Sequence, residues 1–276
     1  MSIKKACAVL NVAKSGYYEF LGRPKSQTRI EREAMEPFVI EIFEKNKGRY
    51  GARRISAELK RKGIFASHKR VAKILASLGL QAKGCAKRYR RKKPVLASGE
   101  NILNRDFDVN VRNRVWVGDI TYLATKEGFL YLAVYLDLFS RKIVGWAVSK
   151  RINENLTLAA LNQAVGREEP AVGLCVHTDR GSQYTSRRFE SELVSQGFIH
   201  SYSRKGNPYD NAVMESFYKT LKRELPARGK FESRIDARQE VFKFIELYYN
   251  TRRSHSTIGN MSPVEYERLF EQKLDS

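Results

Sequence analysis

The hydrophobic pattern of this chain of 276 residues changes near residue 112. Before that point, apolar residues recur at intervals of three and four, which is the spacing of amphipathic helices. Beyond it, short runs rich in β-branched and aromatic residues alternate with helical stretches, as expected for a sheet covered by helices. The pattern therefore predicts an all-helical N-terminal region followed by an α/β domain.

The first half of the helical region is predicted to hold three helices. Two short helices lie within 2–21, and Ser15 is the expected cap of the second. A longer amphipathic helix covers 27–46, and Pro37 should kink or restart it. Its apolar face is formed by Ile30, Phe38, Ile42 and Phe43.

Residues 51–80 have the pattern of a helix-turn-helix. The first helix ends at Gly63, and Ser67 caps a second helix that stops at Gly79. In a helix-turn-helix of this kind the second helix enters the major groove of DNA. A solvated basic face on a structural hairpin is the alternative. The side chains expected to contact DNA are His68, Lys69, Arg70 and Lys73.

Eight further elements are predicted in the α/β domain. Strands cover 115–121, 129–137, 141–149, 172–178 and 198–202, and helices cover 153–165, 186–196 and 210–225. Along the chain the order is three strands, helix, strand, helix, strand, helix. This order is typical of the ribonuclease H-like fold, whose sheet begins as an antiparallel meander and continues with parallel strands.

The chain is expected to end in helices. Ser262 and Pro263 begin a final short helix. A longer one covers 234–250, with an inward face formed by Ile235, Val241, Phe244, Ile245 and Tyr248.

The charge is strongly positive and uneven, with a net charge of +21. Residues 1–100 carry 25 Lys and Arg against 8 Asp and Glu, and residues 101–276 carry 26 against 22. A basic half beside a nearly neutral one indicates an arm for nucleic acid, and membrane binding is the weaker alternative. The run 87–94 could follow a DNA backbone through Arg88, Arg90 and Arg91, or serve only as a solvated linker.

Cysteine and histidine spacing points to neither a disulfide framework nor a zinc site. The three cysteines are far apart, and the four histidines show no metal-ligand pattern, which suits a reducing cytoplasm. The longest apolar run, 129–136, is far shorter than the ~18 residues of a membrane span.

Three acidic residues stand where a phosphodiester-cleaving site would need them. Asp119 lies on a predicted strand, Asp179 follows another, and Glu215 is on a helix. Carboxylates at such positions can bind Mg²⁺, and two ions roughly 3.5–4 Å apart can stabilise the attacking and leaving oxygens. Lys222 lies two helical turns beyond Glu215 and could hold a phosphate. By themselves, three acids among 30 are weak evidence.

The sequence around these acids carries a family resemblance. The segments 116–121 (WVGDIT), 177–184 (HTDRGSQY) and 207–217 (NPYDNAVMESF) resemble the three catalytic blocks of the DDE integrase and transposase core. The chain is most similar to the downstream-frame (OrfB) protein of bacterial insertion-sequence transposases, the insertion sequence three family. The tail 248–255 (YYNTRRSH), followed by Ser262 and Pro263, extends the resemblance over essentially the whole chain.

The resemblance implies a metal-dependent DNA strand cleavage and strand transfer reaction. Asp119, Asp179 and Glu215 would hold two Mg²⁺ or Mn²⁺ ions, and Lys222 would bind DNA phosphate. Asn211 and Arg252 are further candidate DNA contacts. The implied partners are the terminal inverted repeats of the element, target DNA, further copies of the chain and the upstream-frame OrfA protein. The expected location is the bacterial cytoplasm, at the nucleoid.

Four regions follow from these predictions. They are a helical DNA-binding region over 1–82, a basic linker over 83–111, a ribonuclease H-like catalytic core over 112–225 and a C-terminal helical extension over 226–276. Two alternatives remain at this point: a ribonuclease H-like nuclease that cuts without joining, and a DNA-binding regulator whose catalytic fold is inactive.

Several neighbouring residues have less certain roles. His177 could tune the metal site or make a structural hydrogen bond, whereas Asp137 and Trp116 are expected to be structural. Arg253 and His255 could reach DNA or pack against the catalytic helix, and the first of these is favoured.

Overall fold

The computed structural model describes residues 3–24, 26–83, 109–204, 211–225 and 230–274. The chain divides into two compact units, Met1–Ala82 and Lys83–Ser276, and each is described by itself. The predicted DNA contacts Arg88, Arg90 and Arg91 lie outside the described residues.

The first unit begins with two short helices, α1 (Ile3–Val9) and α2 (Lys14–Gly22). Asn11 adopts a left-handed conformation between them, so the chain turns where the apolar pattern breaks. The cap position of α2 is Ala13, which makes no side-chain cap hydrogen bond. The prediction that Ser15 caps this helix is therefore wrong, because the helix starts one residue before it.

Helix α3 (Gln27–Lys45) is continuous and does not restart at Pro37. Its buried side chains are Met35, Val39 and Ile42, which flank the proline on both sides and pack into a core with the next two helices. The predicted apolar face is wrong in part, since Ile30 and Phe38 are 48% and 42% exposed. The face shifts because these partners cover only one side of the helix.

The predicted helix-turn-helix is present. Helix α4 (Ala52–Arg61) is followed by Gly63 at φ 76°, and the Ser67 hydroxyl accepts a hydrogen bond from the Arg70 amide at the start of α5 (His68–Ser77). Gly79, at φ 65°, ends the unit's last helix as expected. The buried core contains Ile55, Leu59, Val71, Ile74 and Leu75.

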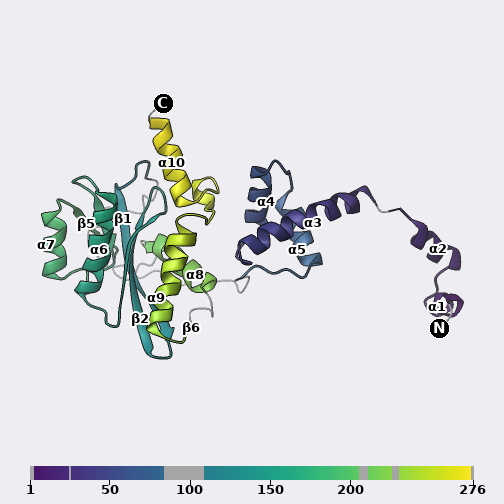
Figure 1. The fold of residues 1–276 in the computed structure, drawn as a ribbon, viewed down its shortest axis with the longest axis horizontal. Coiled ribbons are helices and arrows are strands. Elements are labelled where there is room, and N and C mark those ends of the chain that lie inside the picture. The colour runs from purple at the N-terminus through teal and green to yellow at the C-terminus, as the bar shows by residue number, and fades with distance from the viewer. Residues whose placement is uncertain (1–2, 25, 84–108, 205–210, 226–229, 275–276) are drawn as a thin grey trace. The chain divides into compact units, whose positions relative to one another are not determined.

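The second unit is built on a mixed sheet of order β3-β2-β1-β4-β5, with a short β6 paired to the far end of β1 (Figure 1). Strands β1 to β3 form an antiparallel meander, and β4 and β5 are parallel to β1. This is the predicted ribonuclease H-like topology, and β1 is longer than expected. The strands are β1 (Val115–Thr125), β2 (Gly128–Asp137), β3 (Ile143–Ser149), β4 (Cys175–Thr178), β5 (Ile199–Tyr202) and β6 (Lys230–Phe231).

Helices cover both faces of this sheet (Figure 1). Helices α6 (Glu154–Glu168) and α7 (Arg187–Ser195) lie on one face, and α8 (Ala212–Glu224) and α9 (Arg234–Phe244) lie on the other. Each face has its own buried core. Gly145 allows α6 to approach, because a Cβ there would lie 2.3 Å from the Ala160 carbonyl oxygen.

Helix α9 runs into a π-helical turn, Ile245–Tyr249, and α10 (Pro263–Leu274) begins at the predicted proline. Most of the predicted inward face is buried, but Ile235 is 71% exposed, so that part of the prediction is wrong. Ala237 takes the buried position in the first turn instead. No helix in the described part of the chain is long and apolar enough to cross a membrane.

Candidate active site

Three elements bring the predicted acidic residues toward one edge of the sheet. Asp119 lies within β1, and Asp179 directly follows β4, its parallel neighbour, in which His177 is paired with Val117. Glu215 is in the first turn of α8. The Tyr218 hydroxyl of the same helix donates a hydrogen bond of 2.5 Å to the main-chain carbonyl of Asp119, which ties α8 to β1.

Asp119 is the acid whose environment is most perturbed. Burial raises its pKa to about 7, and the charges of Asp179 and Glu215 add to the rise. A hydrogen bond of 2.7 Å from the Ile120 amide and the charge of Lys222 act in the opposite direction. The charges of Asp179 and Glu215 therefore act on Asp119, so the three carboxylates interact electrostatically.

Asp179 is exposed and is oriented by the turn that follows it. Its Oδ1 accepts a hydrogen bond of 2.9 Å from the Gly181 amide. A Cβ at Gly181 would lie 2.4 Å from Oε1 of Gln183 and 3.0 Å from Oδ1 of Asp179. A side chain at position 181 would therefore displace the ends of the Gln183 and Asp179 side chains.

The carboxylates are near one another without forming a closed metal cage. Among the described residues, no three His, Cys, Asp or Glu side chains are arranged to hold a metal ion. Glu215 instead accepts a bond of 2.9 Å from Lys219. The donor set nevertheless suits a hard divalent cation, because all three candidate ligands are carboxylates and the charges of two of them act on the buried third.

Two lysines of α8 belong to the site. The Nζ of Lys222 lies 4.5 Å from the centroid of the Tyr122 ring, and burial lowers the pKa of this lysine while Asp119 raises it. Lys222 is therefore placed close to the carboxylates, as predicted. Lys219 was missed in the sequence analysis, although its position four residues after Glu215 is the spacing of a helical ion pair.

Three nearby residues are structural. Both ring nitrogens of His177 lie 2.9 Å from serine hydroxyls, those of Ser201 and Ser203, and the ring is fully buried. Asp137 is buried and accepts hydrogen bonds from the Asn113 amide and from the amide and hydroxyl of Ser140. The third residue, Trp116, is fully buried in the core. The structural interpretation thus holds for each.

The position of Asn211 relative to Glu215 differs from the predicted one. It precedes α8 in a non-helical conformation, so it does not share a helical face with Glu215. Its side chain is 8% exposed, and its Oδ1 has no hydrogen-bond partner among the described residues. It makes no side-chain cap of the helix.

Arg253 packs against the catalytic helix, so the favoured prediction of a DNA contact is wrong. Its side chain is 4% exposed, and its Nη2 donates to Oε1 of Glu224 on α8 at 3.0 Å. The neighbouring Arg252 is exposed. His255 is half-buried, and its ring contacts that of Tyr249 edge-on.

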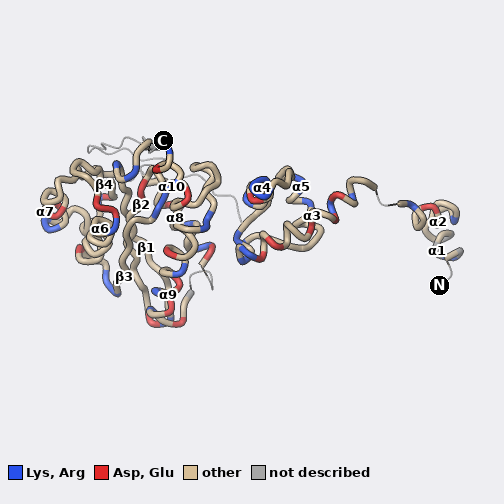
Figure 2. The backbone as a smooth tube through the Cα atoms, turned by 45° about the horizontal axis from the view of Figure 1, so that its top comes forward, with Lys and Arg blue, Asp and Glu red and all other residues tan. Residues whose placement is uncertain are grey.

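In the first unit, α5 presents the predicted basic residues. His68, Lys69 and Lys73 are exposed, whereas Arg70 is half-buried and pairs with Glu31 of α3 at 2.8 Å. Lys and Arg also occur along α4 and α3 (Figure 2).

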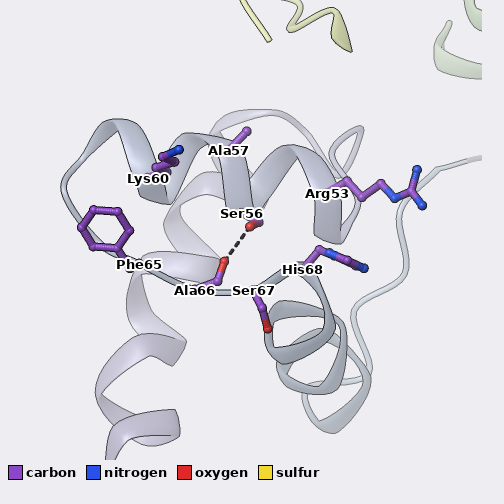
Figure 3. Close-up of a pocket in the computed structure, with 8 residues that line it drawn as sticks. All are labelled: Arg53, Ser56, Ala57, Lys60, Phe65, Ala66, Ser67 and His68. Atoms are coloured by element: carbon purple, nitrogen blue, oxygen red, sulfur yellow. Dashed lines mark hydrogen bonds between the residues drawn. The ribbon is translucent and has the colours of Figure 1, made fainter. Parts of the chain in front are cut away.

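Arg53 and Lys60 of α4 share a pocket of about 570 Å³ with His68 (Figure 3). Phe65, in the turn, lines the same pocket and is 78% exposed. The Ser56 hydroxyl donates to the Ala66 carbonyl at 2.6 Å and holds the turn against α4. The sequence analysis missed Arg53 and Lys60, although their spacing of seven residues places them on one helix face.

Comparison with known proteins identifies both units. An integrase core domain model matches residues 110–208, a second integrase core domain model matches 196–263, and an HTH-like domain model matches 29–92. These matches agree with the predicted fold class of each unit.

Two relatives match over nearly their full length. The transposase for insertion sequence element IS904 of Lactococcus lactis is 50% identical over 89% of this chain and 98% of its own. Transposase InsF for insertion sequence IS3A of Escherichia coli is 42% identical over 96% of this chain and 94% of its own.

A more distant similarity is to a chain of the simian T-cell lymphotropic virus intasome in complex with PP2A regulatory subunit B56 gamma. It has a TM-score of 0.44 and 19% identity, over 76% of this chain and 69% of that one. This likeness is too remote to carry a conclusion. On the extent of the closer matches, the chain belongs to the IS3 family of insertion-sequence transposases, proteins of DNA transposition that contain an integrase core domain.

Proposed function

We propose that this chain cleaves DNA strands at the ends of an insertion sequence and transfers them, with Asp119, Asp179 and Glu215 as its catalytic carboxylates. One observation carries the assignment: the pKa of Asp119 is raised by burial together with the charges of the other two. Acids from β1, the end of β4 and α8 that act on one another in this way are what a cation-binding phosphodiester site requires.

The three carboxylates would hold Mg²⁺ or Mn²⁺, with two ions as the proposed number. When bound, such ions stabilise the charge that develops on the oxygens of the displacement. Burial is the main cause of the raised pKa of Asp119, and a bound cation would offset the smaller rise that comes from the charges of Asp179 and Glu215. Glu215 would exchange its bond with Lys219 for the cation, and Lys222 would hold a phosphate of the DNA.

The reaction has two displacements at phosphorus. Water attacks a phosphodiester at the element end, which releases a 3′-hydroxyl and leaves a 5′-phosphate. That 3′-hydroxyl then attacks a second phosphodiester, which joins the strands and frees a new 3′-hydroxyl. Both steps can use the same carboxylates, because both need the same charge stabilisation.

Each of the four regions would have its own role in the reaction. Residues 1–82 would bind DNA through His68, Lys69 and Lys73 of α5, with Arg53 and Lys60 beside them, and 83–111 would follow the DNA backbone. Residues 112–225 would carry out the chemistry, and 226–276 would support α8. Pairing two element ends implies a homo-oligomer on DNA, and the upstream-frame OrfA protein would act as fusion or partner.

The test is a cleavage and joining assay on labelled DNA that carries the terminal inverted repeats of the native element, with Mg²⁺ or Mn²⁺. The chain is assayed alone and fused to its OrfA partner. Glu215→Gln should abolish both products. Glu240→Gln is the matched control, because Glu240 of α9 also pairs with a nearby lysine but lies on another helix.

Each other outcome points to an alternative. Cleavage without joining in the fused protein would show a nuclease. No reaction in the fused wild type, with DNA binding intact, would show a DNA-binding regulator with an inactive core. Full activity in Glu215→Gln would refute the assignment of the glutamate.

A further inference from the structure

The far half of the β1–β2 hairpin carries aromatic side chains that face solvent. Tyr122 is 54% exposed and Phe129 is 51% exposed, and Tyr131 is partly exposed beside them. The ring centroids of Tyr122 and Phe129 are 5.0 Å apart, and those of Phe129 and Tyr131 are 6.4 Å apart. These three rings, here called the aromatic platform, form one contiguous surface. In soluble proteins, large contiguous exposed apolar surfaces mark sites of interaction or ligand binding.

The fold leaves this surface open. Helix α6 covers the sheet face beside β2 and β3, and the hairpin extends past the end of that helix (Figure 1). On β1, the parallel pairing with β4 stops at Val117, and the pairing with β6 begins only at Ala124. In the described part of the chain, no strand pairs with this edge of β1 between those two residues.

The aromatic platform begins on the strand that carries Asp119. Tyr122 is three residues after Asp119 on the same strand, which is roughly 10 Å along it. The side chains of Asp119 and Tyr122 point to opposite faces of the sheet. Lys222 interacts with both of them. Its Nζ lies 4.5 Å from the centroid of the Tyr122 ring, and its charge acts on Asp119.

The rim of the aromatic platform is basic. Ser149, the last residue of β3, is paired with Tyr131, and the exposed Lys150 and Arg151 follow it directly. Two acids lie near the turn of the hairpin: Glu127 accepts a hydrogen bond from the Arg234 amide, and Glu232 pairs with Lys126. Aromatic faces ringed by cations suit a polyanion that carries flat apolar groups.

We propose that the aromatic platform binds unpaired nucleobases of single-stranded DNA next to the phosphodiester on which the carboxylates act. This inference rests on the proposed function and adds the conformation of its substrate. Bases stacked inside a regular duplex present no free face to surface rings such as these, so DNA seated here would be unpaired beside the reacting bond. Stacking on exposed aromatic residues is the usual way in which proteins hold single strands without reading their sequence.

The test compares two labelled single strands of equal length, an oligothymidylate and the same backbone with abasic sites throughout. Binding to the full chain is followed by fluorescence anisotropy. The wild type should bind the oligothymidylate about fivefold or more tightly than the abasic strand, as expected for even one stacked base. Tyr122→Ala and Phe129→Ala should each lose most of this preference, without weaker binding to the abasic strand.

Conservative and matched variants separate stacking from folding. Tyr122→Phe and Phe129→Tyr keep the rings and should keep the preference. Phe242→Ala removes a phenyl group of similar exposure, 46%, from α9 and should also keep it. Equal binding of both strands by the wild type, or an unchanged preference in both alanine variants, would overturn the proposal. Loss of self-association in those variants with the preference intact would also overturn it, in favour of a protein partner.

Failure of this inference can be told from failure of the proposed function. Glu215→Gln should keep the base preference, because it leaves the rings in place. Cleavage and joining by a wild type that shows no preference would refute only the aromatic platform. A base preference that depends on Tyr122 and Phe129, in a fused protein that neither cleaves nor joins, would refute only the proposed function.

Discussion

At the scale of single residues, burial decides how each acid behaves. Asp119 and Asp137 lie on neighbouring strands of one sheet, and burial raises the pKa of both, to about 7 and about 6. Asp137 is surrounded by three hydrogen-bond donors, whereas Asp119 faces two other carboxylates. The first is a structural acceptor, and the second is a group that a cation would stabilise.

The raised pKa of Asp119 predicts a pH-dependent stability. The folded protein raises this pKa from 3.8 to about 7, so its stabilising contribution is present below the lower value and is lost as the pH rises through the upper one. In EDTA, Asp119→Asn should therefore become more stable than the wild type as the pH rises. We expect a gain on the order of 2 kcal/mol above neutral pH, after discounting for partial exposure.

Chemical denaturation in a pH series measures this difference. Added Mg²⁺ should raise the denaturation midpoint of the wild type and have little effect on Asp119→Asn, which gives a readout of cation binding apart from activity. A constant difference between the two proteins across the pH range would contradict the prediction.

Asp137 gives a second prediction, for stability without a role in the reaction. Asp137→Ala leaves the Asn113 and Ser140 amides without their acceptor in a buried site. The free energy of unfolding should fall by about 3 kcal/mol. Urea denaturation checks this, and Asp236→Ala, a half-buried acid in the first turn of α9, is the control with a smaller expected loss. A loss no larger than that of the control would contradict the structural role.

At the scale of elements, α8 is the part that must be held in place, because it carries Glu215, Lys219 and Lys222. Its N-terminal half is tied to β1 by Tyr218, and its last turn is anchored by the buried ion pair between Glu224 and Arg253. The C-terminal segment thus supports the candidate active site through packing.

Removing one partner of this ion pair should lower the free energy of unfolding more than replacing both partners with apolar side chains. Arg253→Met removes the buried partner of Glu224 and leaves the more exposed Arg223, at 3.8 Å, as its cation, and we expect a loss of about 3 kcal/mol in the free energy of unfolding. The double variant Glu224→Met, Arg253→Met should recover much of that loss, since two apolar side chains can replace a buried pair. Denaturant unfolding compares them with Arg252→Met, the exposed neighbour. Equal losses in the single and double variants would contradict this account.

Element boundaries were predictable where a strong local signal marks them, and less so elsewhere, as at Ser15 and at the end of β1. The Ser67 cap, the left-handed Gly63 and Gly79, and the proline at the start of α10 lie where the sequence indicates. The buried face of each helix was less predictable. Ile30 and Ile235 fit the helical periodicity as well as their buried neighbours do, and only the packing partners of α3 and α9 show that both are exposed.

At the scale of the whole molecule, charge and chemistry are carried by different parts of the chain. Residues 1–100 hold 25 of the 51 Lys and Arg but only 8 of the 30 Asp and Glu, while the three candidate catalytic acids lie in the nearly neutral remainder. Binding to DNA should therefore depend steeply on salt because of the basic part.

The salt dependence predicts the role of individual lysines. If Lys69 and Lys73 contact phosphates, each alanine substitution should reduce the slope of log affinity for duplex DNA against log salt by about 0.9. Lys243→Ala, which removes an exposed lysine of α9 that pairs with Glu240, should leave the slope unchanged. Titrations at several salt concentrations measure the slopes. An unchanged slope in the double variant Lys69→Ala, Lys73→Ala would place the DNA elsewhere.

The order of elements, the uneven charge and the identity of the three acids could be known from the sequence, since each is written in local periodicity, composition or motif. The burial of Arg253, the pairing of His177 with two serines and the exposed rings of Tyr122 and Phe129 could not. These depend on which segments, distant along the chain, cover a side chain or leave it open. The desolvation and the pKa of a polar group depend on whether such segments bury it. Only the tertiary structure therefore decides which polar groups are structural and which can react.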